Sequence, residues 1–193
     1  MRDDISSLVA ESLEGSARVQ SIVSSLKDFA HLGTGEVTRA DVSRLLDATL
    51  QVIWNQVKYK AEVRKDYGEL PPIRCYAQRL NQVFLNILLN AVQAIEVHGV
   101  ITIATRREGD TVSIRIADTG MGIPPEILGR IFEPFFTTKE AGKGTGLGLS
   151  VSYDIVKSHG GEIRVESTPG TGTAFTIILP IEPVFPEDAA NGG

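Results

Sequence analysis

The stretch "LNILLNAVQAI" (85–95) decides the fold, because it predicts a helix that has to be buried. No charged residue occurs between Asn81 and Ile95. Apolar residues recur there at helical spacing and make one core face and a second apolar side: Val83, Phe84, Ile87, Leu88, Ala91 and Ile95 on the first, Leu85, Leu89 and Val92 on the second. A helix that is apolar on most of its sides lies inside a protein, so we expect this one at the centre of the core.

A narrow stripe of amides is left on the same helix, formed by Gln82, Asn86, Asn90 and Gln93 at positions i, i+4, i+8 and i+11. A solvent-facing stripe is the simplest interpretation, but solvent faces mostly carry Lys and Glu, and this one carries neither. A buried amide without a partner costs about 1–3 kcal/mol. We therefore expect these amides to meet a polar group that the helix itself does not supply.

Composition narrows the class of protein. The chain has 193 residues and a net charge of −5, and its basic residues are scattered, so a nucleic-acid partner is not indicated. The single cysteine, Cys75, excludes an internal disulfide and fits a reducing compartment. The longest uncharged run, Leu80–Ile95, is shorter than the roughly 18–20 residues of a membrane span. With no signal peptide visible, we expect a soluble cytoplasmic protein, although a larger parent could carry a membrane anchor.

The first thirty residues differ from the rest because they follow a heptad pattern. The residues of the pattern alternate at spacings of three and four: Ile5, Leu8, Ser12, Gly15, Val19, Ile22, Leu26 and Phe29. The pattern is weak in its middle, because Ser12 and Gly15 are not large apolar residues. Such a helix packs either on its own domain or on a helix of another chain, and the heptad favours the second. "HLGTGE" (31–36) then breaks the helix and predicts a linker.

The rest of the chain mixes helices and strands. We expect helices over 41–57 and 146–158, a strand over 61–68, a turn at "ELPPIRCY" (69–76), a hairpin over 100–120 turning at Glu108–Gly109–Asp110, and a second hairpin around "PGTG" (169–172). This order predicts an α+β fold, a two-layer α/β sandwich with helices on one face of a mixed, mostly antiparallel sheet, preceded by one long helix. The tail (182–193) has no periodicity and is expected to be disordered.

Two glycine clusters point to a phosphate ligand. "DTGMGI" (118–123) ends a strand, and "GKGTGLGLS" (142–150) runs into a helix N-terminus, where free backbone N–H groups and the helix dipole favour phosphate. Two ordinary turns are the alternative. A Walker loop needs Ser or Thr after its lysine, and it is excluded because Gly144 follows Lys143. The dinucleotide fingerprint needs glycines at spacings of two and then three, and it is excluded because Gly144, Gly146 and Gly148 are spaced by two and two.

A family resemblance joins these clues. Five segments in order resemble the N, G1, F, G2 and G3 boxes of the ATP-binding domain of sensor histidine kinases: "NILLNA", "DTGMGI", "IFEPFFTTK", "GTGLGLS" and "TPGTGTAF". The wider superfamily includes ATPase domains of gyrase, heat-shock protein 90 and mismatch-repair proteins, and the fold implied is the Bergerat-type sandwich. "LLNAVQAI" further resembles the branch related to nitrogen-regulation kinases. The implied organisation is a dimerisation and histidine-phosphotransfer helix with its linker (1–36), a catalytic domain (37–181) and the tail.

The resemblance implies that Mg²⁺ and ATP lie against the amide stripe. Asn90 would supply an oxygen ligand to Mg²⁺, a hard cation that shares its ligands with phosphates. Asn86, one turn back, would reach the same ion or a phosphate. The resemblance also implies that the superfamily's ATPases carry a glutamate at the position of Asn86, and that this glutamate activates water. Asparagine cannot accept a proton at neutral pH, which favours a kinase over an ATPase.

The other boxes gain implied roles in the same way. Asp118 would accept a hydrogen bond from the adenine 6-amino group, and Gly120 and Gly122 would leave room for the base. Phe132, Phe135 and Phe136 would anchor a lid over 123–145, with at least one of the three in the core. The remaining implied nucleotide-binding residues are Gln93, Ile123, Thr138, Lys139, Lys143, Gly144, Thr145, Gly146, Leu147, Gly148, Leu149 and Thr173. Solvated loop side chains are the alternative for the two lysines.

Two departures from the family pattern stand out. Tyr76 replaces an aspartate that many members carry before the N-box helix, which puts the start of that helix in question. The phosphoacceptor helix, with its histidine followed by an acidic residue, is absent: His31, His98 and His159 precede Leu or Gly. We expect His159 to be a helix C-terminal residue whose positive charge suits the dipole. The chain is thus expected to be a catalytic fragment that does not phosphorylate itself.

The implied function is transfer of the ATP γ-phosphate to a histidine outside this chain, in two-component signalling. The implied partners are the phosphoacceptor helix of the parent kinase, a response regulator receiver domain and a second copy of the parent, joined through the N-terminal helix. A non-enzymatic ATP-dependent switch and a serine kinase of the same superfamily are the alternatives.

Overall fold

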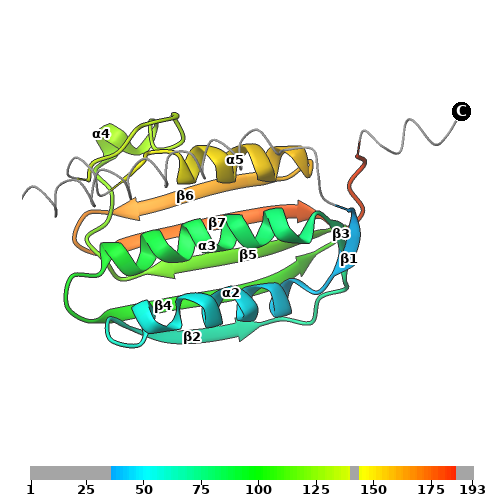
Figure 1. Cartoon of the computed structure of the whole chain (residues 1–193), viewed down its shortest axis with the longest axis horizontal. Helices are drawn as coiled ribbons and strands as arrows, with labels where there is room; N and C mark the ends of the chain where they lie inside the picture. The colour runs from blue at the N-terminus through cyan, green and yellow to red at the C-terminus, as the bar shows by residue number, and fades with distance from the viewer. Residues whose placement is uncertain (1–35, 140–143, 186–193) are drawn as a thin grey trace, which may run out of the picture.

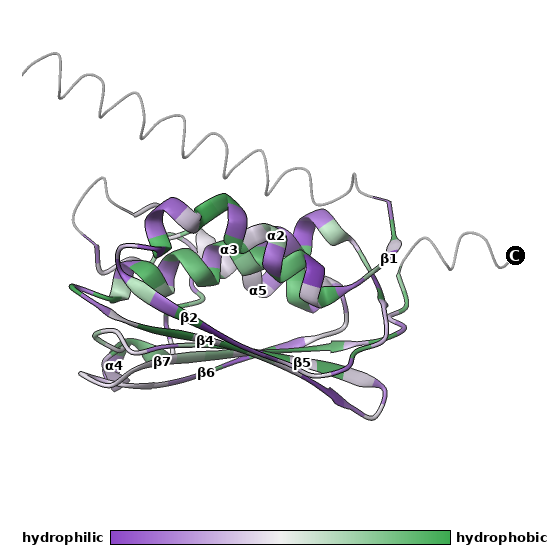
Figure 2. Cartoon of the chain, turned by 90° about the horizontal axis from the view of Figure 1, so that it is seen from below, coloured by the Kyte–Doolittle hydropathy of each residue, from purple (hydrophilic) through white to green (hydrophobic). Residues whose placement is uncertain are grey.

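The computed structural model describes residues 36–139 and 144–185, so the predicted N-terminal helix and Lys143 lie outside the described residues. Five strands form the main sheet in the order β2-β4-β5-β7-β6, with bounds β2 (Ala61–Tyr67), β4 (Gly99–Glu108), β5 (Thr111–Asp118), β7 (Gly172–Pro180) and β6 (Glu162–Thr168). Helices α2 (Val42–Val57), α3 (Ala77–Ala94) and α5 (Gly148–Ser158) cover one face of it (Figures 1 and 2). The predicted two-layer sandwich is confirmed.

Strand pairing follows the expected hairpins. β4 and β5 pair antiparallel up to Glu108 opposite Thr111, so the turn is shorter than predicted and consists of Gly109 and Asp110. Gly109 has φ +63°, a conformation that glycine adopts without steric cost. β6 and β7 form the second predicted hairpin, while β2 runs parallel to β4 and makes the sheet mixed.

Helix α2 begins where a polar side chain caps it. The Asp41 carboxylate accepts hydrogen bonds from the backbone N–H groups of Ser43 (2.9 Å) and Arg44 (3.2 Å), which satisfies two free donors of the first turn. The helix turns its apolar face to the sheet: Val42, Leu46, Leu50, Ile53 and Val57 are buried. Its position on β2 is fixed further by Asp47, which accepts hydrogen bonds from Lys65 and Tyr67.

Helix α3 is the centre of the core, as predicted. All six residues of the expected core face are buried, and Leu85 and Leu89 on the second side are half-buried. The helix begins directly after Tyr76, whose backbone is extended, although no side chain caps it within the described residues. The missing aspartate therefore does not displace the start. At the other end, Lys60 Nζ donates a hydrogen bond to the carbonyl oxygen of Ile95 (2.9 Å). No helix in the two described ranges is long and apolar enough to cross a bilayer.

A small second sheet was not predicted. β1 (Thr38–Ala40) pairs antiparallel with β3 (Ile73–Cys75), so the second half of the expected turn at 69–76 is wrong. Each strand has three residues, too few to show a period of two, and the pairing joins segments that are far apart in sequence. Ile73 and Cys75 are fully buried by it.

The start of the C-terminal tail also differs from the expectation. Disorder was expected from residue 182, but Phe185 is only 1% exposed. Its ring lies edge-on to the rings of Tyr76 (4.7 Å between centroids) and His159 (5.5 Å). The Arg74 guanidinium lies over the Phe185 ring, 5.3 Å from the centroid. A single aromatic residue in a polar tail gives no periodic signal, so burial of this kind is not visible in sequence. Residues 186–193 lie outside the described residues.

His159 does end a helix, but not for the expected reason. It is 1% exposed, its Nε2 accepts a hydrogen bond from the backbone N–H of Tyr76 (3.1 Å), and its Nδ1–H donates to the carbonyl oxygen of Ile155 (2.7 Å). This arrangement requires the neutral ring. Burial lowers the pKa of His159 below its ordinary 6.5, against the weaker effect of the Ile155 hydrogen bond. A favourable positive charge at the helix end was therefore the wrong expectation.

We predict that acid weakens the fold through His159. Because its folded-state pKa is lowered, the unfolded chain binds the proton more readily, so the stability contribution is complete above about pH 6.5 and is lost as the pH falls through the lowered pKa. The free energy of unfolding should decrease between pH 7.5 and 5.5, measured by urea titration with fluorescence of the single tryptophan, Trp54. His159→Gln should flatten this dependence, whereas the exposed His98→Gln should leave it unchanged. An unaltered slope in His159→Gln would contradict the assignment.

Candidate functional site

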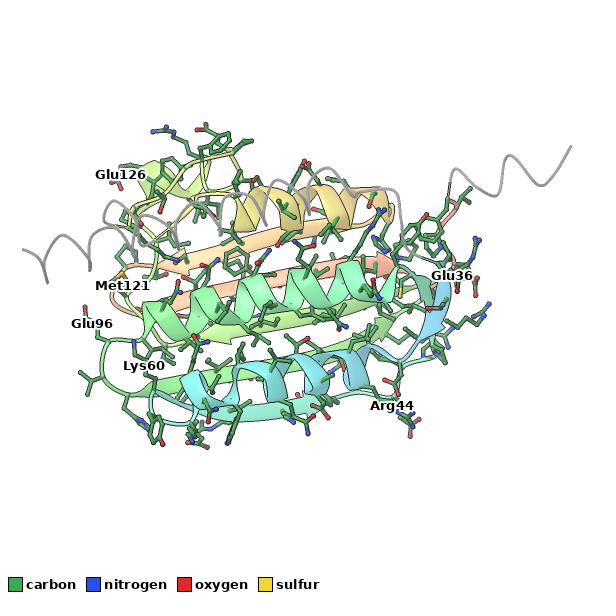
Figure 3. All side chains as sticks on the ribbon, in the orientation of Figure 1. Glu36, Arg44, Lys60, Glu96, Met121 and Glu126 are labelled. Atoms are coloured by element: carbon green, nitrogen blue, oxygen red, sulfur yellow. The ribbon has the colours of Figure 1, made fainter. Side chains whose placement is uncertain are left out.

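Three predicted segments meet at one end of the molecule. The C-terminal half of α3, the end of β5 and the N-terminus of α5 lie there (Figure 1). Met121 and Glu96 mark this end, and Glu36 lies at the opposite one (Figure 3). The backbone N–H of Met121 donates to the carbonyl oxygen of Ala94 (2.9 Å), so the loop after β5 is tied to the last turn of α3.

The amide stripe meets polar groups from outside its own helix, as expected. Asn86 Nδ2 donates to the carbonyl oxygen of Gly148 (2.9 Å) and to Ser152 Oγ (3.2 Å), both on α5. Gly148 packs against the amide at van der Waals distance, 3.5 Å from a Cβ placed on it to Asn86 Cγ. Asn86 therefore joins α3 to the start of α5, and its remaining oxygen is the group left for a ligand.

Further along the stripe, Lys139 brings a positive charge to the helix. Its Nζ donates to Asn90 Oδ1 (3.2 Å) and to Gln93 Oε1. Two amide oxygens one turn apart thus converge on one cation. Desolvation lowers the pKa of Lys139, although the residue reaches the surface.

Asp118 supplies a buried carboxyl group at the end of β5. It is 9% exposed, and its Oδ1 accepts a hydrogen bond from the backbone N–H of Gly120 (2.8 Å). Burial raises its pKa, and hydrogen bonds from the backbone of Gly120 and Thr173 oppose this effect. Thr173 is buried and its hydroxyl lies 2.9 Å from Ser167 Oγ. The carboxyl group is thus held among polar groups by hydrogen bonds from the backbone of Gly120 and Thr173.

The glycines of "DTGMGI" have a structural role that was not anticipated. A Cβ on Gly120 would lie 2.6 Å from the carbonyl carbon of Ala94, and one on Gly122, which has φ +73°, would lie 2.3 Å from the carbonyl oxygen of Thr168. Both positions let two backbone segments approach closely. This packing accounts for the glycines without a base, and the space predicted for adenine beside them remains a prediction.

Helix α5 begins at the second glycine cluster, and the backbone N–H groups of its first turn are available as hydrogen-bond donors. Leu147 occupies the capping position, and among the described residues no side chain caps the helix there. The first N–H groups of an α-helix have no intrahelical partner and favour anions. Gly146 has φ +67° and packs directly on the backbone of Phe135, which ties this loop to the phenylalanine segment.

The three phenylalanines divide as expected. Phe132 and Phe136 are half-buried and pack against the core, Phe132 also lying 5.4 Å from the Tyr153 ring. Phe135 is 68% exposed and has φ +66°. The short helix α4 (Pro125–Leu128) precedes them and has no buried residue. The prediction that at least one phenylalanine belongs to the core is confirmed.

The other predicted residues are distributed around this end. Ile123 packs against the core, and its N–H donates to Ser167 Oγ (2.8 Å). Gly144 lies close to Thr137 and Lys139. Thr138 is exposed, Leu149 is half-buried, and Thr145 Oγ1 accepts from the N–H of Leu147 (3.4 Å). Sequence reasoning missed Ser152 and Ser167, because a single serine has no motif to mark it.

A divalent cation fits the amide stripe only if a phosphate shares it. No group of three or more His, Cys, Asp or Glu side chains within the described ranges could hold a metal. Asn90 and Gln93, however, present oxygen atoms, the ligand type that Mg²⁺ prefers, and they already face the ammonium group of Lys139. The donor set therefore suits a cation that keeps most of its ligands from phosphate and water.

A cavity of about 220 Å³ is lined by Asp118 and Thr173, but by no residue of α3 or α5. It is also lined by Arg115, Ala117 and Glu166, which alternate along their strands with the residues packed under the helices. The cavity therefore lies on the face of the sheet that the helices do not cover, which we call the open face. The convergence of side chains on the helix side is the better candidate.

Comparisons with known proteins show the family of the chain. Residues 75–183 match the family described as "Histidine kinase-, DNA gyrase B-, and HSP90-like ATPase". The sensor histidine kinase ZraS of Escherichia coli (strain K12) is 39% identical over 167 residues, which cover 85% of this chain and 35% of ZraS. The chain thus spans about a third of this relative.

Solved structures show the same fold. The nucleotide-free catalytic domain of histidine kinase ThkA matches with a TM-score of 0.70 and 29% identity, over 77% of this chain and 97% of that domain. Full-length ShkA in complex with AMPPNP matches with a TM-score of 0.76 and 27% identity, over 86% of this chain and 36% of ShkA. The chain belongs to the family of histidine kinase-, DNA gyrase B- and HSP90-like ATPases and carries the ATP-binding catalytic domain found in sensor histidine kinases.

Proposed function

We propose that the whole protein is an ATP-dependent protein histidine kinase of a two-component system, and that this domain binds Mg²⁺-ATP between α3, the end of β5 and the start of α5. The phosphoacceptor helix of the parent kinase would receive the phosphate, and a response regulator receiver domain would take it over. The parent would act as a homodimer through the N-terminal helix. The cytoplasm, where ATP is available, is the compartment that suits this activity.

The observation that carries the proposal is the convergence of three complementary groups at one end of the fold. Asp118 offers a buried acceptor for an exocyclic amine, α5 offers free backbone donors for phosphates, and Asn90 offers an oxygen for a cation. These groups match the base, the phosphates and the metal of one ATP molecule. Gln93, Lys139 and Thr173 complete the proposed site at its edges.

Each side chain would contribute to binding and orientation rather than to bond making. Bound Mg²⁺ would neutralise phosphate charge and favour transfer of the γ-phosphoryl group. Asn90 and Asn86 would hold the phosphates in register with α5, because Asn86 is itself bonded to Gly148 and Ser152. Neither amide can take a proton from water, so these two side chains offer no base for hydrolysis. ATP would persist until a histidine approaches.

The histidines of this chain do not suit the acceptor role. His159 is buried, and both of its ring nitrogens are engaged in hydrogen bonds. His98 is exposed in the loop after α3, but Gly99 follows it, so the acidic residue that the family pattern places directly after the acceptor histidine is missing there. His31 lies outside the described residues. Phosphate is therefore expected to leave this chain for another domain.

A labelling experiment tests the proposal. With γ-labelled ATP and an added domain that bears a phosphoacceptor histidine, acid-labile label should appear on the added domain and not on His31, His98 or His159. The same mixture with the acceptor histidine replaced by glutamine is the control. Binding of ATP without any transfer would favour the non-enzymatic switch. Label on a histidine of this chain, at a rate comparable to that of a complete kinase, would contradict the proposal.

A further inference from the structure

One lysine occupies the position at which a cation is expected. Lys139 Nζ contacts Asn90 Oδ1 and Gln93 Oε1, which lie one turn apart on α3. Both oxygens point away from the helix toward the ammonium group. An ammonium group is a compact cation with three donors, so after these two bonds one donor remains for water or phosphate.

We propose that Lys139 is the resident cation of the magnesium site: in the absence of nucleotide its ammonium group holds the Asn90 and Gln93 oxygens in the orientation that the metal needs, and it must leave before the metal binds. This inference rests on the proposed function. The two cations exclude each other because both need Asn90 Oδ1 and because positive charges at contact distance repel. Lys139 is therefore a positioning residue and a competitor of the metal.

The surroundings of Lys139 allow it to move. The residue is exposed overall, and the contacts of its side chain within the described residues include the two amides and Gly144. A Cβ on Gly144 would lie 3.0 Å from Lys139 Cδ and 2.7 Å from Thr137 Oγ1, so glycine at this position leaves the space in which the lysine stem lies. The ammonium group can turn from the amides toward a phosphate oxygen without disturbing the core.

The alternative is that Lys139 is only a surface lysine that happens to reach α3, or that it binds phosphate without competing with metal. Metal affinity distinguishes these roles. Removal of a competitor tightens metal binding, removal of a phosphate ligand alone weakens nucleotide binding, and removal of a surface lysine changes neither. Lys139→Met keeps the aliphatic stem and removes the charge, while Lys139→Arg keeps a positive charge near the amides.

The experiment measures Mn²⁺ binding to the protein–ADP complex. With protein in excess, so that all ADP is bound, Mn²⁺ is titrated and free Mn²⁺ is followed by electron paramagnetic resonance. Lys139→Met should bind Mn²⁺ about three- to tenfold more tightly than the wild type, the effect of losing a partly exposed charged competitor. Lys139→Arg should stay near the wild type, as should Lys157→Met, a matched loss of charge at the far end of α5.

The possible results separate this inference from the proposed function. Unchanged or weaker Mn²⁺ affinity in Lys139→Met, in a protein that still binds ADP, would overturn the role of Lys139 alone. Failure of the wild-type protein to bind ADP would overturn the proposed function and this inference together.

Discussion

Replacement of Asn90 by alanine is expected to weaken Mg²⁺-ATP binding on the order of 100-fold, about 2.8 kcal/mol. Asn90 presents its amide oxygen at the edge of the site, where only Lys139 contacts it among the described residues whose hydrogen bonds the structure gives. In the proposed complex this oxygen would bind the metal, so its loss removes a ligand that alanine cannot replace. Isothermal titration calorimetry with ATP and Mg²⁺ measures the change.

Two controls make the Asn90 result specific. Asn55→Ala removes an exposed amide from α2 and should not alter ATP affinity. ATP binding in EDTA should differ little between Asn90→Ala and the wild type, because the lost interaction is with the metal. The fold should stay intact, since alanine is the better helix former. Unchanged affinity for Mg²⁺-ATP in Asn90→Ala would remove Asn90 from the site.

Substitution of Asp118 by asparagine is expected to reduce ATP affinity about ten- to a hundredfold, the cost of about 1.5–3 kcal/mol for one charged hydrogen bond. The wild-type protein should prefer ATP over GTP by a similar factor, because guanine presents an acceptor where adenine presents its 6-amino donor. Competition of ATP and GTP against a fluorescent nucleotide measures both effects. Asparagine can keep the acceptor that holds the Gly120 N–H (2.8 Å), so the turn after β5 should persist.

A matched variant separates base recognition from a general loss of charge. Asp154→Asn removes a carboxylate from the exposed side of α5 and should leave both affinity and base preference unchanged. Asp118→Ala should cost more than Asp118→Asn, because it also removes the acceptor for Gly120. Equal competition by ATP and GTP in the wild-type protein would overturn the assignment of Asp118 to the base.

The elements that sequence predicted are those with strong periodicity. The uncharged run within α3 required burial on most sides, and the alternation along β4 and β5 specified both their hairpin and the face that packs under the helices. The sequence also predicted that the amide stripe contacts polar groups, because four amides in an apolar helix need hydrogen-bond partners. Their actual partners, Ser152 and Lys139, come from other elements and could not be derived from spacing.

The features that sequence did not predict depend on tertiary packing. The three-residue strands β1 and β3 are too short to carry a pattern. In sequence Phe185 belongs to a polar tail, and its burial depends on ring contacts with Tyr76 and His159, which are distant in sequence. His159 follows the rule for a helix end in sequence, but burial reverses the preferred charge. In each case a contact between distant segments outweighs the local preference.

The central claim is that nucleotide binds on the helix side of the sheet, and backbone amide NMR tests it most directly. On addition of Mg²⁺-AMPPNP, the largest chemical-shift changes should fall in residues 90–94, 119–123 and 145–150, while residues 159–162 at the opposite end should change little. Shifts that instead centre on the open face of the sheet, around the cavity at Glu166, would contradict the account.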